Sequence, residues 1–258
     1  MIGRAIYPYQ DSVVLVTGAG TGIGRSIARA FLEQGAKVAA VGRTRSALEE
    51  ATGGFSPEQV LVHVADLAVE GDAASAVHEV VTRFGRLDVV VASAGTSEAS
   101  DVWRYDPGVW KRQRAINLDS MIEIATASAP HLARTGGNFL AISSIAGIRG
   151  DWGMFAYNAT KGAVNLMVQS LALDLGARGV RVNAIAPGFT TSRLTRERLS
   201  DPEYRARLLD RIALGREADP DDIARAALFV CSPDAAYITG AIIPVDGGVS
   251  ASSGTPRG

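Results

Sequence analysis

The stretch Val13-Val-Leu-Val-Thr-Gly-Ala-Gly-Thr-Gly-Ile-Gly24 joins an uninterrupted apolar run to a cluster of glycines. Apolar residues then recur at the spacing of one helix face, at Ile23, Ile27, Ala30 and Phe31. A buried strand, a tight turn and a helix are therefore predicted. Glycines there let the chain approach a pyrophosphate closely, and the N–H groups and dipole of the helix favour phosphate oxygens. The same letters can form a plain glycine-rich turn, but their place after the first apolar strand favours a nucleotide ligand.

The alternation of apolar runs and helical periods continues towards the C-terminus. Further strands are expected at Lys37–Val41, Val60–Ala65, Asp88–Ala92, Phe139–Ser143, Arg181–Ala186 and Ile242–Val245. Helices are expected between them, at Arg45–Ala51, at Ala74–Phe84, from near Val109 to about Leu132, after Tyr157 and at Pro220–Phe229. This order predicts an α/β fold, a Rossmann-like doubly wound parallel sheet of about seven strands with helices on both faces. Because no linker or repeat interrupts the order, residues 1–258 are expected to form a single domain with a flexible tail at 249–258.

Composition excludes several classes of function. The 258 residues are 47% hydrophobic and 21% charged, and the net charge of −1 argues against a nucleic-acid or anionic-membrane partner. Cys231 is the only cysteine, and the histidines lack metal-ligand spacing with it, so no metal site is expected. The N-terminal residues lack the apolar core of a signal peptide, and no uncharged run reaches membrane-spanning length. A soluble, cytoplasmic protein is therefore expected.

Tyr157 and Lys161 are separated by one helical turn, which would place both side chains on one face of a helix. An unperturbed phenol titrates near pH ~10, so it is a poor acid or base at neutral pH. A nearby ammonium stabilises the phenolate and lowers the pKa of the phenol towards the working range. The pair is also what an exposed tyrosine and a solvated lysine would give by chance, so its meaning depends on its surroundings.

The end of the second strand bears on the choice of cofactor. An acidic residue there would accept hydrogen bonds from ribose hydroxyls and repel a 2′-phosphate, but this chain has Gly42-Arg43. Arg43 can form charge-assisted hydrogen bonds to a phosphate, so NADP is favoured over NAD. The alternative is that Arg43 only begins an exposed helix. Asp66, after the third strand, is placed to accept the adenine amino group, although a helix N-cap would look the same in sequence.

With these pieces placed, the chain resembles the short-chain dehydrogenase/reductase family over nearly its whole length, and in particular its 3-oxoacyl-[acyl-carrier-protein] reductase-like members. Thr17–Gly24 matches the T-G-x-x-x-G-x-G turn of that family, and Tyr157-Asn-Ala-Thr-Lys161 matches its Y-x-x-x-K. Ser144 lies thirteen residues before Tyr157, which is the serine-to-tyrosine spacing of the family. The remaining matches are Asn117, Pro187-Gly188-Phe189-Thr190, Tyr237-Ile-Thr-Gly240 and Asp246-Gly-Gly248.

The resemblance implies hydride transfer between C4 of the nicotinamide and the carbon of a ketone or secondary alcohol. Tyr157 would act as general acid in reduction and as general base in oxidation. Lys161 would lower the pKa of that phenol and hold the ribose of the nicotinamide nucleoside. Ser144 would orient the substrate oxygen, as an oxyanion stabiliser does, and Asn117 would hold a water in a proton relay.

The resemblance also implies which residues contact the cofactor and the substrate. The expected cofactor contacts are Gly18, Thr21, Gly22, Ile23, Gly24, Arg43, Asp66, Leu67, Ser93, Ala94, Gly95, Tyr157, Lys161, Pro187, Gly188 and Thr190. The expected substrate contacts of this kind are Ser144 and Tyr157, with residues 194–214 as a lid. Trp152 is also expected to contact substrate, because it places a bulky apolar side chain near Tyr157; the alternative is that it packs in the core or at an interface. One position departs from the family pattern, because Ser93 stands where the family usually has asparagine.

The helix after Tyr157 is apolar around most of its circumference, so it is expected to be wholly buried, in the core or against another subunit. Together with the resemblance, this predicts a homotetramer, with a dimer as the alternative. The expected partner besides other copies is a small carbonyl or alcohol substrate. Two other functions stay open: an NAD-dependent catabolic alcohol dehydrogenase of the same family, and a non-catalytic nucleotide-binding scaffold.

Overall fold

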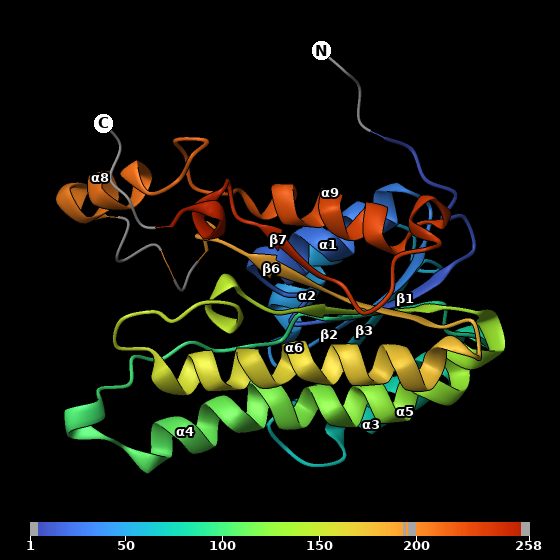
Figure 1. The fold of residues 1–258 in the computed structure, drawn as a ribbon. Coiled ribbons are helices and arrows are strands. Elements are labelled where there is room, and N and C mark those ends of the chain that lie inside the picture. Colours follow the sequence, from blue (N-terminus) through green and yellow to red (C-terminus); the bar gives the residue numbers. More distant parts are fainter. Residues whose placement is uncertain (1–4, 193–194, 196–199, 254–258) are drawn as a thin grey trace.

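Seven parallel strands form one sheet in the computed structural model, which describes residues 5–192, 195 and 200–253 (Figure 1). The order across the sheet is β3-β2-β1-β4-β5-β6-β7, and every neighbouring pair is parallel. The strands are β1 (Val13–Thr17), β2 (Lys37–Gly42), β3 (Val60–Val64), β4 (Val89–Ala92), β5 (Asn138–Ile142), β6 (Arg181–Pro187) and β7 (Ile242–Val245). The predicted doubly wound α/β fold is confirmed.

Helices cover both faces of the sheet, and each face has its own apolar core (Figure 1). One face carries α1 (Gly22–Glu33), α2 (Arg45–Thr52) and α9 (Pro220–Cys231). The other carries α3 (Asp72–Phe84), α5 (Ser120–Thr135) and α6 (Phe155–Gly176), with α4 (Pro107–Arg114) leading into α5. Because both faces are covered, β1 and β4 are buried at every position, and their residues read as uninterrupted apolar runs.

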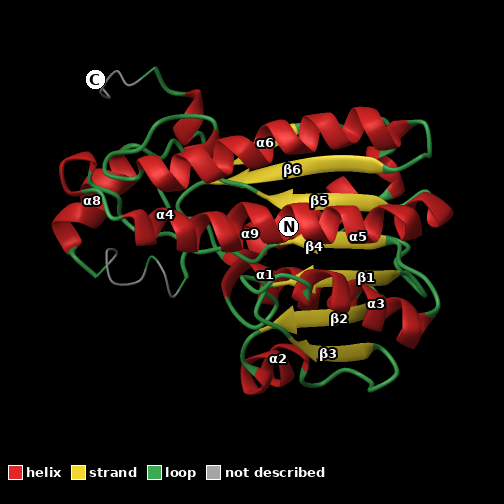
Figure 2. Ribbon diagram, turned by 90° about the horizontal axis from the view of Figure 1, so that it is seen from below, coloured by secondary structure: helices red, strands yellow, loops and turns green. Residues whose placement is uncertain are grey.

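The strand order marks one edge of the sheet as the place where a ligand is expected. The strand order reverses between β1 and β4, and in open α/β sheets ligands bind at the carboxyl ends of the strands beside such a switch point. Figure 2 shows α4 and α8 (Pro202–Asp210) at the edge towards which the strand arrows point. The loops after β1, β4, β5 and β6 all emerge at this edge and carry the residues singled out in the sequence.

The single helix expected from near Val109 to about Leu132 is interrupted. A π-helical turn at Ala115–Asp119 joins α4 to α5, and Asn117 lies buried at its centre. The extra residue of a π turn turns one side chain out of the regular helical order, and such turns are frequent at functional sites. The spacing of apolar residues does not reveal it, because both helices keep their own period.

The expectation that α6 is wholly buried is wrong within its own chain. Leu166 is 70% exposed and Leu173 is 83% exposed, so α6 packs on the sheet with one face and leaves an apolar stripe outside. The sequence shows apolar residues on both faces but not which face the sheet covers.

Two segment predictions fall partly outside the described residues. Of the predicted lid at 194–214, residues 194 and 196–199 are not described, and the described part includes α8. Within the predicted flexible tail at 249–258, Val249–Ala251 form a short 3-10 helix, and residues 254–258 are not described. No helix in the described part of the chain is long and apolar enough to cross a membrane.

Candidate active site

The turn after β1 is shaped by glycines that no other residue could replace. A Cβ built on Gly24 would lie 2.3 Å from the carbonyl oxygen of Gly18, and Gly18 itself has a φ of +66°. Gly22 has a φ of +53° and begins α1. Thr21, the N-cap of α1, makes no side-chain cap hydrogen bond, and the first turn of α1 carries no acidic residue. The positive end of α1 is therefore open to an anion, and the glycine cradle fits the phosphates of a dinucleotide.

The loop after β4 is attached to β1 through its main chain. The hydroxyl of Thr17 accepts hydrogen bonds from the N–H groups of Ser93 (2.9 Å) and Ala94 (3.0 Å). The departure from the family at Ser93 therefore leaves this attachment intact, because the contacts do not use the side chain of residue 93. Gly95 brings the loop to the catalytic candidates, since a Cβ there would lie 3.3 Å from Asn117 Oδ1 and 3.7 Å from Lys161 Nζ.

Asn117 uses its side-chain amide to hold this loop in place. Its Oδ1 accepts from the N–H of Thr96 (2.8 Å), and its Nδ2 donates to the carbonyl of Thr96 (2.9 Å) and to Thr160 Oγ1 (3.2 Å). Both N–H groups are thus occupied, and only the second lone pair of Oδ1 remains for a water. The structure gives the side chain a positioning contact that the sequence did not predict, and the relay role stays a prediction.

Ser144 and Ser143 face opposite ways after β5. The hydroxyl of Ser144 accepts from the N–H of Ala146 (3.1 Å) at the start of a 3-10 turn. It is near enough to Tyr157 to lower the pKa of the phenol. The hydroxyl of Ser143 is buried and donates to Asn165 Oδ1 (2.6 Å) instead. The alternation expected of consecutive extended residues therefore directs Ser144 towards Tyr157.

Tyr157 lies in the first turn of α6, partly buried beneath the loops of this edge. Burial raises the pKa of its phenol above the usual range, the hydrogen bond with Ser144 lowers it, and the charge of Asp151 raises it further. The lowering influence on the pKa of the phenol comes from Ser144.

Lys161 is buried on the same helix face. Its side chain is 4% exposed, Nζ donates to the carbonyl of Ile142 (2.9 Å), and Nζ lies 5.8 Å from the centre of the Tyr157 ring. Burial lowers the pKa of the ammonium to about 8, so the group is mostly charged at neutral pH. A positive charge at this distance favours the phenolate over the phenol. The predicted effect of Lys161 on the pKa of Tyr157 stays a prediction.

At the end of β2, Arg43 is exposed and makes no ion pair within the described residues. Arg45, two residues further along the chain, forms an ion pair with Glu49 at 3.7 Å. Gly42 has no side chain, and Leu48 is the nearest group on that side of the strand. A guanidinium without a partner beside the adenosine end of the cradle is available for a phosphate.

Asp66 does not act as the N-cap of the next helix, so that alternative reading is wrong. The N-cap of α3 is Gly71, whereas Asp66 Oδ1 accepts from the N–H of Ala68 (3.1 Å). The N–H of Asp66 is in turn held by Asp72 Oδ2 (2.8 Å). Leu67 is buried in the core, so only its main chain can face a ligand.

The expected contacts after β6 are brought to the same edge. Pro187 ends β6, and a Cβ on Gly188 would lie 2.8 Å from Asp246. Thr190 is buried, and its hydroxyl donates to the carbonyl of Gly188 (3.1 Å). Trp152, expected to contact substrate, is 98% exposed on its loop, so its part in binding stays a prediction.

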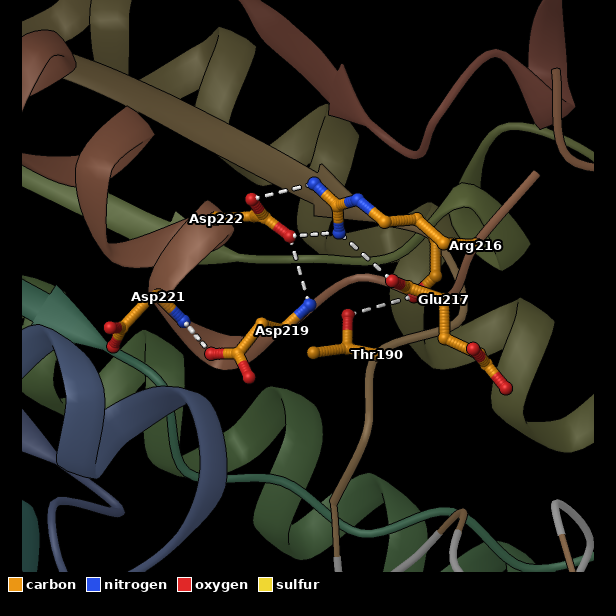
Figure 3. Close-up of polar contacts among 7 residues, drawn as sticks. Thr190, Arg216, Glu217, Asp219, Asp221 and Asp222 are labelled. Atoms are coloured by element: carbon orange, nitrogen blue, oxygen red, sulfur yellow. Dashed lines mark hydrogen bonds and ion pairs between the residues drawn. The ribbon is translucent and has the colours of Figure 1, made fainter. Parts of the chain in front are cut away.

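One residue of the predicted lid is tied to the segment before α9 by an ion pair, and Arg216 of that segment is tied to α9 (Figure 3). Arg205 of α8 binds Glu217 through two hydrogen bonds of 2.5 and 3.0 Å. Arg216 binds Asp222 in the same two-pronged way, at 2.6 and 3.0 Å, and holds the pKa of that carboxyl below its usual range. Asp222 also accepts from the N–H of Asp219, which completes the cap of α9. Arg205 and Arg216 are thus both engaged in ion pairs within the chain.

Sequence reasoning missed the polar residues that position the loops. Thr17 and Asn158 each hold main-chain groups of a neighbouring loop, and Asn165 does the same one helical turn beyond Lys161. A signal was present in α6, where positions 158, 161 and 165 share one face and are polar within an apolar helix. No group of three or more His, Cys, Asp or Glu side chains in the described ranges is placed to hold a metal.

Comparisons with known proteins agree with this geometry. The family model described as enoyl-(acyl carrier protein) reductase matches residues 18–250. Meso-2,3-butanediol dehydrogenase of Serratia marcescens is 34% identical over 249 residues, which are 96% of this chain and 98% of the relative. A short-chain dehydrogenase/reductase of Brucella melitensis, titled glucose/ribitol dehydrogenase, superposes with a TM-score of 0.91 at 31% identity, covering 95% and 99% of the two chains. A putative NAD(P)-dependent gluconate 5-dehydrogenase of Beutenbergia cavernae, solved with bound NADP, has a TM-score of 0.88 at 34% identity, covering 95% and 100%.

Proposed function

The chain belongs to the short-chain dehydrogenase/reductase family, and on that premise we propose that it is an NADP(H)-dependent oxidoreductase interconverting a ketone and a secondary alcohol. The observation that carries the proposal is the convergence of Ser144, Tyr157 and Lys161 at the edge where the glycine cradle opens. The cofactor supplies the hydride at C4 of its nicotinamide, and the protein supplies binding, orientation and proton transfer. All four catalytic candidates are present and buried or partly buried, which argues against a non-catalytic scaffold.

The side chains divide the chemistry among them. Tyr157 gives its proton to the carbonyl oxygen as the carbon is reduced, and takes it back in the oxidation direction. Ser144, which is near enough to Tyr157 to lower the pKa of its phenol, orients the substrate oxygen beside that phenol. Lys161 holds a positive charge near the ring and favours the phenolate. Asn117 keeps the loop after β4 fixed against this group through Thr96.

The preference for NADP rests on Arg43. Its exposed guanidinium has no partner in the described structure, and no carboxylate follows β2 to repel a 2′-phosphate. The NADP in the B. cavernae structure is a property of that protein, and it shows that a chain of this fold and similarity holds the cofactor. The alternative, an NAD-dependent catabolic dehydrogenase, is separated from this proposal by kcat/KM for the two cofactors.

We further propose that the chain is one domain working in the cytoplasm as a homotetramer. The apolar stripe on α6, with Leu166 and Leu173 exposed, supports assembly, because apolar surface of this kind is usually covered by another subunit. Replacing both leucines with Glu should yield smaller species by light scattering, whereas unchanged mass would show that the stripe is not an interface. Cys231 is free and buried, in keeping with a reducing compartment.

A carbonyl panel tests the proposed activity. Diacetyl, acetoin, cyclohexanone and ethyl acetoacetate are each offered with NADPH or NADH, and oxidation of the cofactor is followed by absorbance. At least one ketone should be reduced, faster with NADPH. Stoichiometric NADPH binding without turnover of any ketone or matching alcohol would favour a scaffold, and a clear preference for NADH would favour the NAD-dependent alternative.

A further inference from the structure

The loop that carries Ser144 is fastened to α6 by side chains of α6 itself. We call residues 144–149 the Ser144 turn. Asn158 Nδ2 donates to the carbonyls of Ala146 (2.6 Å) and Arg149 (2.8 Å), and Asn165 Nδ2 donates to the carbonyl of Gly147 (2.9 Å). Three carbonyls of one short turn are thus bound by two amides of the helix that carries Tyr157.

The Ser144 turn lies directly against the main chain of α6. A Cβ built on Gly147 would lie 2.7 Å from the carbonyl oxygen of Lys161, which leaves no space between turn and helix. The turn therefore cannot move closer to α6, whereas this contact does not prevent a movement away from the helix. The hydrogen bonds from Asn158 oppose that movement.

Ala146 links this fastening to the catalytic hydroxyl. Its N–H donates to Ser144 Oγ (3.1 Å), and its carbonyl accepts from Asn158. The position of Ser144 Oγ is thus fixed by a residue that Asn158 holds, and Ser144 is near enough to Tyr157, the residue immediately before Asn158, to lower the pKa of the phenol. Ala146 is therefore the one residue that connects Asn158 to the hydroxyl of Ser144.

We propose that Asn158 is a positioning residue, which holds the Ser144 turn on α6 and so keeps Ser144 Oγ in place on the side of Tyr157. The orientation of its amide is set by chemistry, because a flipped amide would put Oδ1 against two carbonyl oxygens. In the observed orientation Oδ1 is buried without a partner. A buried acceptor without a partner destabilises the fold. The two hydrogen bonds that Asn158 donates therefore contribute more than this cost.

The proposal rests on the proposed function for its effect on rate, since it assumes that Ser144 and Tyr157 act together. Misplacement of a catalytic group by about 1 Å lowers rates by as much as ~100-fold. Asn158→Ala should therefore lower kcat by roughly 10- to 100-fold, while KM for NADPH changes little because the glycine cradle is distant. Asn158→Asp, nearly the same shape but ionised and unable to donate, should be at least as slow.

A double-mutant cycle separates positioning from general damage. In the Ser144→Ala background, Asn158→Ala should have almost no further effect on kcat, because the hydroxyl that it positions is gone. Val168→Ala serves as the matched control, since Val168 is a fully buried residue of α6 that makes none of these hydrogen bonds. Val168→Ala should lower thermal stability and leave kcat close to that of the wild type. Additive losses of kcat from Asn158→Ala and Ser144→Ala would overturn the proposal.

A spectroscopic measurement tests the proposal without any turnover. In protein containing tyrosine labelled with carbon-13 at Cζ, the Tyr157 signal is assigned by its loss in Tyr157→Phe. This signal should move in the same direction in Asn158→Ala and Ser144→Ala, and stay in place in Val168→Ala. Asp151 and Lys161 are the charged groups that face the phenol, and both are unchanged in these variants. A Tyr157 signal that moves in Ser144→Ala but not in Asn158→Ala would refute the positioning role even if no ketone were ever reduced.

Discussion

Replacing Lys161 with Met should change how stability depends on pH. The pKa of the buried ammonium is about 8 in the folded protein and 10.5 when unperturbed. Between these values the unfolded chain binds more protons than the folded one, so raising the pH favours folding. At about 1.4 kcal/mol for each pH unit, the difference between the two pKa values corresponds to ~3 kcal/mol. Above pH 10.5 Lys161 is neutral in both states, so its burial costs no free energy of charge desolvation. This advantage is lost as the pH falls through about 8, where the buried group becomes charged.

Urea unfolding of cofactor-free wild type and Lys161→Met across this range measures the effect. The free energy of unfolding of the wild type, minus that of the variant, should rise by ~3 kcal/mol from pH 8 to 10.5. Subtraction cancels the groups whose pKa does not depend on Lys161. The lost hydrogen bond from Nζ to Ile142 gives an offset at every pH, so only the slope counts. Lys111→Met removes an exposed ammonium and is the control. A flat difference for Lys161→Met would refute the claim that burial destabilises this charge.

Two further substitutions test the cofactor site. Arg43→Ala should lower kcat/KM for NADPH by roughly 10- to 100-fold, as expected for a lost charge-assisted bond of about 1.5–3 kcal/mol, and leave NADH unchanged; Arg45→Ala is the matched control, and equal losses for both cofactors would speak against a 2′-phosphate contact. Gly24→Ala should weaken NADPH binding in a calorimetric titration and destabilise the protein by about 1–3 kcal/mol, because its Cβ has no space beside Gly18. Gly176→Ala, whose Cβ meets nothing within 4 Å, should do neither, and wild-type binding by Gly24→Ala would contradict the cradle.

The strands and the glycine turn could be predicted because their constraints are local. Val13–Thr17 and Val89–Ala92 are buried on both faces, and such strands can hardly contain anything but apolar residues. Gly24 is required by a backbone contact with Gly18, which lies only six residues earlier. Patterns of this kind are complete within one short window of sequence.

The π turn at Asn117 and the exposed face of α6 could not be predicted, because each depends on partners distant in sequence. Asn117 is turned inward to hold Thr96, and the period of the flanking helices does not record that extra residue. Leu166 and Leu173 look like core residues, and only the position of the sheet shows that they face outward.

In the candidate site, the residues that carry the proposed chemistry could be predicted, whereas the residues that hold them in place could not. Tyr157, Lys161 and Ser144 follow from residue types and spacing, and the structure brings the three together. Asn158 looked like an ordinary helix residue, because its acceptors lie in a turn whose path the sequence does not reveal. Trp152 was expected near the substrate from its position alone, and exposure of its ring shows that position along the chain does not fix direction.

Transfer of deuterium tests the central claim most directly. A ketone that the wild type reduces is incubated with NADPH carrying one deuterium at C4. The two stereoisomers of this cofactor are used separately, and the alcohol is analysed by mass spectrometry. One form should place a single deuterium on the carbinol carbon, and Tyr157→Phe should slow the transfer by ~10²–10⁴-fold, while Tyr237→Phe, which changes an exposed tyrosine, should not. An alcohol without deuterium at that carbon, or a Tyr157→Phe protein as fast as the wild type, would contradict hydride transfer assisted by Tyr157.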